Sequence, residues 1–293
     1  MKKDLILGYI HGYQWPQLAP FVNSLRDTDF NGDICFFASG TDDQTSQIIR
    51  EAGIQLVDVP NPRFKLRRKI SKLWWLFRLA PQPLRAPLLK SLADLLVLRY
   101  ILFIEFLRQH ESDYHRVLIT DIRDVIFQKN PFANAPAAGI HFFEEANGRT
   151  IASEPKNSKW IRRSFGRKVH DEYADKPIVC FGTIMGTVAG MVDFLNFWLA
   201  IVASARSIKP CVDQGAFNVA AQRYPRQRYE THKNGESLVQ TMSIMSLADL
   251  IIDANGCVTN QAGEIVALLH QFDRHPELNS RIKVLNKWLA AKC

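Results

Sequence analysis

Apolar and polar positions follow two different periods along the first sixty residues. Short continuous apolar runs, typical of buried strands, alternate with stretches in which apolar residues recur at helical spacing. The predicted strands are 5–10, 34–38 and 54–59, and the predicted helices are 15–26 and a capped segment that begins at Thr41 and ends at Gly53. This β-α-β-α-β order predicts parallel strands joined by helical crossovers, as in a Rossmann-like half.

The same two periods continue through the rest of the chain. Strand-like runs lie at 117–119, 139–143 and 178–186, and helices are predicted at 88–109, at 191–205 and from Cys211 onward. The polar and basic segment 157–170 is predicted to be a mobile loop. No internal repeat and no Gly/Ser-rich linker divides the chain. We therefore expect one α/β domain over residues 1–293, with a mixed, mostly parallel sheet and helices on both of its faces.

Charge and cysteine usage narrow the partners and the compartment. The formal net charge of +8 favours anionic partners such as nucleotides, phosphates, acidic lipids or nucleic acid. The G-x-G-x-x-G pattern of dinucleotide sites is absent after the first strand, which disfavours a dinucleotide cofactor. Five scattered cysteines without a CxxC pair argue against a disulfide framework or a zinc site and favour a reducing compartment. The first apolar run is too short for a signal peptide, so we expect a cytoplasmic protein.

A basic and aromatic insertion at about 61–88 interrupts the alternation of strands and helices. Lysines and arginines are interleaved there with Trp74, Trp75 and Phe77. Such a segment can lie in a membrane interface, bind an anionic polymer or cover a cleft. It can equally be a solvated surface whose aromatic residues pack into the core. We expect peripheral contact with the inner face of an anionic membrane, with both tryptophans at the headgroups.

Two acids follow the predicted strand 117–119 directly. Asp121 and Asp124 stand where an α/β sheet presents its ligand-binding edge. Two carboxylates at this spacing suit a hard divalent cation and the diphosphate that such a cation binds. Asp is also common in turns and at helix caps, and this alternative stays open on the acids alone.

Several motifs occur in an order that resembles a known enzyme family. After the β-α-β half come the acidic strand end with its Phe-x-x-Asn-Pro-Phe tail at 127–132, a Gly-x-Ile-x-Gly segment at 182–186, the pair Asp213-Gln214, and His-Gln-Phe-Asp-Arg-His-Pro at 270–276. Over residues 5–276 this order resembles glycosyltransferases of the GT-A fold, close to the nucleotide-diphospho-sugar transferases. The family's Asp-x-Asp is one residue wider in this chain, and counting back from Pro131 places Asp124 at the second acid.

The resemblance implies a metal and donor site. Asp121, Asp124 and His270 would hold Mn²⁺ or Mg²⁺ on the diphosphate of a nucleotide-sugar, and a UDP-sugar is the expected donor. Because of the wider spacing, one acid can instead bind ribose or pair with Arg123. His270 follows an apolar run and can also be a buried core histidine.

Asp213 and Gln214 are the catalytic pair that the resemblance implies. The acid would lie near the sugar or the acceptor, as general base in an inverting reaction or as a positioning group in a retaining one. The local sequence also suits Asp213 to a helix N-cap, and the two roles are compatible.

The expected donor site includes three further residues. Gly8 and Tyr9 follow the first strand and would approach the nucleotide base, where Tyr9 can stack. Arg99 stands within an apolar helix and needs an anionic partner. The diphosphate is one candidate, and a structural salt bridge to Asp94 or Glu105 is the other.

We therefore expect a glycosyltransferase that moves a sugar from a nucleotide-diphosphate donor to a glycan, lipid or protein acceptor that the sequence does not identify. A phosphoryl-transfer enzyme with an aspartyl nucleophile is an alternative, although the usual Asp-x-Asp spacing is not kept. A non-enzymatic module that binds anionic surfaces through residues 65–78 is another, but it leaves the acids without a role. Nucleic acid is not an expected partner.

Overall fold

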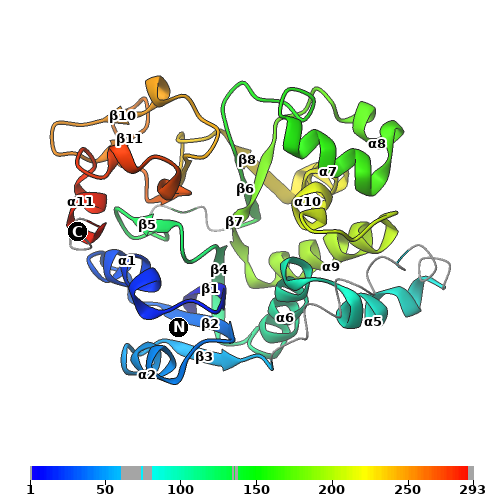
Figure 1. Ribbon diagram of the computed structural model, residues 1–293, viewed down its shortest axis with the longest axis horizontal. Coiled ribbons are helices and arrows are strands. Elements are labelled where there is room, and N and C mark those ends of the chain that lie inside the picture. Colours follow the sequence, from blue (N-terminus) through cyan, green and yellow to red (C-terminus); the bar gives the residue numbers. More distant parts are fainter. Residues whose placement is uncertain (1, 61–73, 75–80, 134, 136–137, 290–293) are drawn as a thin grey trace.

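The computed structural model describes the chain except for residues 1, 61–73, 75–80, 134, 136–137 and 290–293, and for 82–86 it describes the backbone alone. Most of the basic and aromatic insertion expected at 61–88 therefore lies outside the described residues. The described part is a mixed α/β fold in which helices cover both faces of a central sheet (Figure 1).

The central sheet, within the described residues, has seven strands in the order β3-β2-β1-β4-β7-β6-β8. The first four of these run parallel, and β8 is parallel to β6, whereas β7 is antiparallel to both of its neighbours. The predicted mixed and mostly parallel sheet is confirmed. Its strands are β1 (Lys3–His11), β2 (Asp33–Ser39), β3 (Gln55–Asp58), β4 (Tyr114–Thr120), β6 (Ile140–Glu144), β7 (Val179–Thr187) and β8 (Tyr229–His232).

A smaller sheet joins the acidic end of β4 to a segment near the end of the chain. It has the order β5-β12-β9, in which β12 is antiparallel to β5 and parallel to β9. Because β5 follows β4 after a short link, β12 is brought beside the residues that end β4. The strands are β5 (Val125–Phe127), β9 (Val239–Thr241) and β12 (Leu268–His270), and β10 (Ile251–Ile252) pairs separately with β11 (Val258–Thr259).

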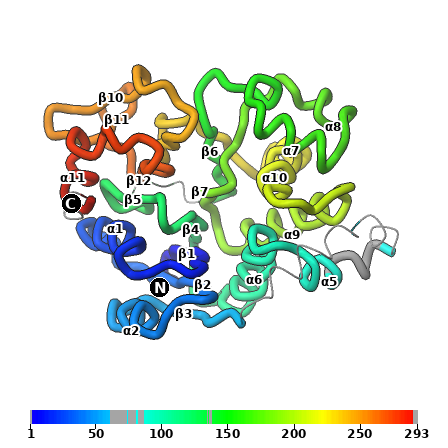
Figure 2. The backbone as a smooth tube through the Cα atoms, in the orientation of Figure 1, coloured from blue at the N-terminus to red at the C-terminus, as the bar shows by residue number. Residues whose placement is uncertain are grey.

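Both faces of the sheet are buried at its inner strands, because these strands are apolar on both sides. In β1, Leu5 and Leu7 join a core cluster with the helices of one face, while Ile6 and Ile10 join the cluster on the other. Helices α5, α6, α9 and α10 cover the first face, and α1 and α2 cover the second (Figures 1 and 2). Helix α7 packs against α10, and α11 packs against α1.

The described residues form α-helices and short 3-10 helices, whose bounds can be compared with the helices predicted from apolar periodicity. The α-helices are α1 (Trp15–Arg26), α2 (Asp43–Glu51), α5 (Gln82–Leu92), α6 (Leu95–Gln109), α7 (Pro155–Phe165), α8 (Arg167–Glu172), α9 (Val188–Ser204), α10 (Val212–Arg223) and α11 (Lys283–Leu289). The short 3-10 helices are η2 (Arg226–Arg228), η3 (Leu247–Asp249), η4 (Phe272–Arg274) and η5 (Pro276–Leu278).

The single helix predicted at 88–109 is in fact two helices, α5 and α6. Ala93 has an extended backbone (φ −63°, ψ 149°) and ends α5. Asp94 then caps α6, because its carboxylate accepts a hydrogen bond from Val97 N at 3.3 Å. The break changes the direction of the chain and sets where α6 meets the sheet.

The mobile loop predicted at 157–170 is also wrong. Its residues form most of α7 and α8, and Glu154 caps α7 by accepting from the backbone N–H of Asn157 at 2.6 Å. The basic residues that indicated a loop lie on the outer side of an amphipathic helix, whose inner side buries Ile161 and Phe165.

Trp74, the one described residue of 61–80, is not at the surface. Its side chain is 1% exposed, and its Nε1 donates a hydrogen bond to the Ala205 carbonyl at 2.9 Å. The expectation that Trp74 lies among lipid headgroups is therefore wrong, and Trp75 lies outside the described residues. Among the helices that are described, none combines the length and the apolar character needed to cross a membrane.

Candidate functional site

A cavity of about 440 Å³ opens at the edge of the central sheet where β1 and β4 end. This is the edge at which open α/β sheets bind ligands. The lining comes from β1, β7 and β12, from residues that follow β1, β4, β6 and β12, and from α6, α7 and α10 or the residue before it. The lining residues are Tyr9, His11, Tyr13, Leu95, Leu96, Arg99, Asp121, Ile122, Arg123, Asp124, Glu145, Trp160, Cys180, Phe181, Gly182, Cys211, Asp213, Gln214, His270, Gln271 and Arg274.

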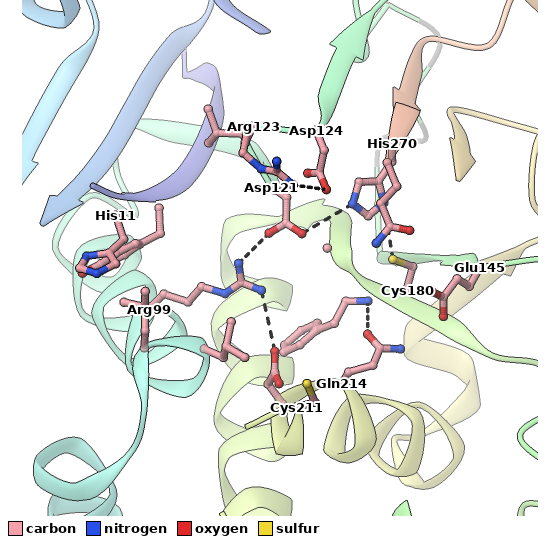
Figure 3. Close-up of a pocket in the computed structure, with 18 of the residues that line it drawn as sticks. His11, Arg99, Asp121, Arg123, Asp124, Glu145, Cys180, Cys211, Gln214 and His270 are labelled. Atoms are coloured by element: carbon pink, nitrogen blue, oxygen red, sulfur yellow. Dashed lines mark hydrogen bonds and ion pairs between the residues drawn. The ribbon is translucent and has the colours of Figure 1, made fainter. Parts of the chain in front are cut away.

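Asp121, Asp124 and His270 bring their polar atoms together in this cavity (Figure 3). One carboxylate oxygen of each acid and a ring nitrogen of His270 all lie within 4.8 Å of one another. Asp121 Oδ2 is 3.6 Å from His270 Nε2. The pairing of β12 with β5 places His270 opposite Val125, the neighbour of Asp124. The three residues that the sequence grouped therefore share one site.

Gly182 leaves open the space that these three groups face. Its carbonyl accepts a hydrogen bond from Asp121 N at 2.8 Å, so β7 lies directly beside the acidic loop. A Cβ at this position would lie 2.6 Å from Asp121 Oδ2 and 2.8 Å from His270 Nε2. Real Cβ atoms do not approach other atoms this closely, so a glycine is needed here for the carboxylate and the imidazole to keep their places.

Arg99 reaches the same acids from α6. Its Nη1 donates to Asp121 Oδ1 at 2.6 Å, and its Nη2 donates to Tyr100 OH at 3.1 Å and lies 3.9 Å from Asp213 Oδ2. Tyr100 OH in turn donates to the Phe181 carbonyl at 2.7 Å. A largely buried guanidinium is thus held between two carboxylates, which is the pairing that a buried charge requires.

The salt bridges expected for Arg99 from the sequence are wrong. Asp94 is occupied as the N-cap of α6. Glu105 pairs with Lys90 across the surface, with Nζ and Oε1 2.5 Å apart. The actual partners are far away in the sequence, because a buried arginine pairs with the carboxylates that the fold brings to it and not with its helical neighbours.

Four buried polar atoms at the cavity have no hydrogen-bond partner within the described part of the chain. They are Arg99 Nε, Asp213 Oδ1, His270 Nε2 and Gln271 Oε1. Buried polar atoms in native proteins are nearly always satisfied, and exceptions often mark a place where a ligand, ion or water binds. Their clustering in one cavity indicates a polar, charged ligand.

The ionisable groups of Asp121, Asp124 and His270 influence one another. Burial raises the pKa of Asp121, but Arg99 and His270 outweigh it and hold that pKa well below its usual range. Burial raises the pKa of Asp124. For His270, burial lowers the pKa, but contact with Cys180 and the two carboxylates reverses the direction and raises it well above the ordinary value. Asp121 is therefore the permanent anion of the site.

Asp213 lies in the first turn of α10 and is not its cap. The N-cap is Cys211, and no side chain caps the helix. Trp198 Nε1 donates to the Asp213 carbonyl at 3.2 Å and anchors this turn. Burial raises the pKa of Asp213 to about 7, with Arg99 opposing the rise. The helix-cap interpretation is therefore wrong, and the Asp213 carboxyl is held near the point of titration at neutral pH.

Gln214 lines the cavity, but its amide is committed to the backbone of β7. Its Oε1 accepts from Phe181 N at 2.9 Å, and its Nε2 donates to the Val179 carbonyl at 2.7 Å. Asn218, one turn further along α10, accepts from Val179 N at 3.0 Å. These hydrogen bonds fix α10 against β7. The position of Gln214 therefore fits a positioning residue for Asp213 better than a reacting group.

Gly8 and Tyr9, which were expected to follow the first strand, lie within β1. Tyr9 lines the cavity and Gly8 does not. Tyr9 OH donates to Ser39 Oγ at 2.9 Å, which holds the ring in place. A Cβ at Gly8 would lie 2.2 Å from Ile122 Cδ1. Gly8 therefore makes room for Ile122, one of the two residues between the acids, and a contact between Gly8 and a nucleotide is not supported.

Arg123, which was expected as a possible partner of one of the two acids, lies 4.0 Å from Asp124 Oδ2 and pairs more closely with Asp273 at 3.0 Å. Other cavity residues were not predicted from the sequence. Burial raises the pKa of Glu145, which also accepts from Asn157 Nδ2 at 3.3 Å, and nothing near Glu145 in the sequence marks it. The lining residues with ionisable or aromatic side chains that were not predicted include Glu145, Trp160, Cys180 and Arg274.

Backbone strain is concentrated at this cavity. Among the described residues, two that are not glycine have positive φ, Cys211 at 69° and Gln271 at 57°. Both line the cavity, one two residues before Asp213 and the other directly after His270. Left-handed conformations of this kind cost free energy and tend to persist at functional sites, where the surrounding structure enforces them.

The residues present fit a divalent cation. Two carboxylates and one imidazole converge, the ring nitrogen has no hydrogen-bond partner, and the glycine beside them leaves the space open. No family model matches the chain, and no curated protein is significantly similar to it. The family resemblance of the motifs therefore stays a prediction, and function has to be inferred from the geometry of this site.

We expect Gly182→Ala to weaken Mn²⁺ binding by about tenfold or more while the protein stays folded, because the added Cβ displaces Asp121 Oδ2 and the His270 ring. Isothermal titration with Mn²⁺ measures the effect, and circular dichroism checks the fold. Gly215→Ala is the matched control, since its Cβ meets neighbours no closer than 3.4 Å. Unchanged Mn²⁺ affinity in Gly182→Ala would show that this gap is not part of a cation site.

A second prediction concerns Asp213 and stability. Its pKa of about 7 in the folded state lies above the 3.8 of an ordinary Asp, so the folded protein binds more protons between these values. The stability that the protonated Asp213 carboxyl contributes is fully present below pH 4 and is lost as pH rises through 7. The loss amounts to about 1.4 kcal/mol for each unit by which the folded pKa exceeds the unfolded pKa. Asp213→Asn should therefore become more stable relative to wild type between pH 4 and pH 8.

Urea denaturation at several pH values across this range measures the difference. Asp175→Asn is the control, because Asp175 is exposed and its pKa is lowered by Lys176. A constant stability difference between Asp213→Asn and wild type over this range would contradict the raised pKa.

Proposed function

We propose that the protein is a glycosyltransferase of the GT-A fold. It would move a sugar from a nucleotide-diphosphate donor, a UDP-sugar by resemblance, to an acceptor that is a glycan, a lipid or a protein. One observation carries the proposal. Asp121 and Asp124 from one segment and His270 from a distant one converge beside the buried Arg99 in a cavity at the carboxyl edge of a mostly parallel sheet. This combination of a cation site and a fixed guanidinium suits a diphosphate.

The order of elements supports the proposal. The half formed by β1, β2 and β3 is the part of such folds that receives a nucleotide, and Tyr9 lines the cavity at its edge. The motif Asp121-x-x-Asp124 ends β4, and the late motif that starts at His270 is brought to it by the small sheet. The spacing of the two acids is one residue wider than in the family, and both still reach His270.

Asp121, Asp124 and His270 are the residues that would hold Mn²⁺ or Mg²⁺. The cation would neutralise charge on the diphosphate as this leaving group departs from the sugar. Because one ligand is an imidazole, Mn²⁺ suits the donor set better than Mg²⁺, which prefers oxygen. Arg99 adds a fixed positive charge, and Arg123 and Arg274 add positive charge elsewhere in the cavity lining.

Asp213 is the best candidate for the proton transfer or for positioning the sugar. In the transfer, the bond between the anomeric carbon and the diphosphate oxygen breaks, a bond to an acceptor oxygen forms, and the acceptor proton must leave. A carboxyl with a pKa of about 7 can accept that proton near neutral pH. Another acid of the cavity, the partly buried Glu145, lies beside Cys180 (Figure 3).

The donor and the cation can be tested together by thermal shift. UDP with Mn²⁺ should raise the melting temperature of the wild type more than either alone, because a ligand that binds only the folded state stabilises it. Asp124→Asn should lose the Mn²⁺-dependent part of the rise and nearly all transfer while staying folded. ADP and GDP serve as base controls. No rise with any nucleotide and Mn²⁺, or wild-type turnover by Asp124→Asn, contradicts the proposal.

Asp121→Asn should behave differently from Asp124→Asn, because Asp121 also neutralises Arg99. We expect it to lose metal binding and, in addition, to be less stable by about 1.5–3 kcal/mol, the usual contribution of a hydrogen bond to a charged group, because Arg99 then keeps only the Asp213 carboxylate 3.9 Å away. Denaturation of the two variants side by side measures this. Equal stability of the two would show that Arg99 does not depend on Asp121.

Asp213→Asn tests the catalytic assignment. Removal of a general base typically slows the chemical step by about 10²–10⁴-fold, so we expect kcat to fall by this amount while UDP and Mn²⁺ binding persist. Hydrolysis of the UDP-sugar, which uses water as acceptor, provides a readout that needs no knowledge of the natural acceptor. The exposed Asp175→Asn is the control, and wild-type turnover by Asp213→Asn would exclude the role.

A further inference from the structure

A second group of metal-ligating side chains lies at the β8 edge of the central sheet. His141 Nδ1 is 3.1 Å from His232 Nε2, and Glu230 Oε2 is 3.8 Å and 3.9 Å from these two nitrogens. All three ligand atoms lie within 4.8 Å of one another. None of the three residues lines the cavity described above. We call this group the His141 cluster.

The backbone of two parallel strands holds the His141 cluster together. In the register of β6 and β8, His141 is opposite Glu230, and His232 is two residues further along β8. Side chains two apart on a strand point to the same face of the sheet, so all three residues project from one face. The spacing of the ligand atoms is therefore set by main-chain hydrogen bonds and needs no flexible loop.

The hydrogen bond of His141 to the backbone selects the tautomer that a metal needs. His141 Nε2 is 2.9 Å from the Ala138 carbonyl oxygen, which can only accept. Nε2 therefore carries the proton, and the neutral ring directs the lone pair of Nδ1 into the cluster. A backbone carbonyl that fixes the outer nitrogen of a ligating histidine is the usual support of a metal-binding imidazole.

The distances and charge of the cluster also suit a metal. Two nitrogens bound tetrahedrally at 2.0–2.1 Å from Zn²⁺ are about 3.3 Å apart, close to the separation of the two histidines. Glu230 supplies the negative charge, and its side chain is 62% exposed, so an ion can enter from solvent.

We propose that His141 Nδ1, His232 Nε2 and the Glu230 carboxylate bind a divalent transition-metal ion, for which Zn²⁺ is the probe, and that a fourth position stays open to solvent. Two imidazoles and one carboxylate favour Zn²⁺ and its neighbours over Mg²⁺ or Ca²⁺. The ion would join β8, the edge strand, to β6 and so stabilise this end of the sheet. The proposal does not depend on the glycosyltransferase function.

The test is Zn²⁺ binding by the full chain after removal of metals with a chelator. Isothermal titration measures affinity and stoichiometry, and thermal shift measures stabilisation. His232→Gln should bind one Zn²⁺ fewer per chain than wild type and lose the associated rise in melting temperature. Glu230→Gln should bind this Zn²⁺ at least about tenfold more weakly, since even the loss of an outer-shell partner has an effect of that size.

Two controls separate this site from others. His115→Gln removes an exposed histidine outside the cluster and should leave Zn²⁺ binding unchanged. His270→Gln removes a ligand of the proposed active site and should leave the His141 cluster able to bind Zn²⁺. Equal stoichiometry and affinity in wild type, His232→Gln and Glu230→Gln would overturn the proposal. The contact between the two histidines would then be a hydrogen bond without a metal. If His232→Gln does not fold, Glu230→Gln decides, because its side chain is exposed.

Discussion

The carboxylate of Asp121 lies between Arg99 on α6 and His270 at the end of β12, and most of the site depends on these two contacts. Removing these charged groups from water is costly, and only close pairing offsets the cost. Arg99 reaches Asp121 from α6, which begins after its N-cap Asp94. His270 can reach it only because the small sheet pairs β12 with β5. One anion therefore links elements that are distant in the sequence.

A network of amides around β7 holds the other side of the site. Gln214 and Asn218 bind the backbone at Val179 and Phe181, which prevents α10 from sliding along the sheet. Asp213 is thereby kept beside Arg99, in surroundings where burial outweighs the guanidinium and its pKa rises. The left-handed backbone at Cys211 is the strain that this placement requires. General acid–base catalysis needs a carboxyl group that is held rigidly and has a pKa near neutral pH.

The two candidate metal sites differ in their donor atoms and in their setting. Asp121 and Asp124 make the cavity cluster rich in oxygen, and it stands where a phosphate ligand can complete it. The His141 cluster is rich in nitrogen and stands at a sheet edge, where an ion would brace the fold. The cysteine count had argued against a zinc site, but that reasoning covers thiolate sites and says nothing about histidines paired across strands.

Apolar periodicity alone determined the strands and helices of the first sixty residues, the strand that ends at the acids, and the mixed, mostly parallel sheet, because these follow from local propensity and burial. It failed at 157–170, where the charges of an amphipathic helix resembled a loop, and at Asp94, whose capping signal was overlooked in a long apolar run. The motif order also marked the three residues that meet at the cavity. Only the tertiary structure decided that Arg99 pairs with Asp121, that Gly182 leaves the gap and that His141 faces His232. Such contacts join residues far apart in the chain, and their distances are set by strand register and helix packing, which no local pattern encodes.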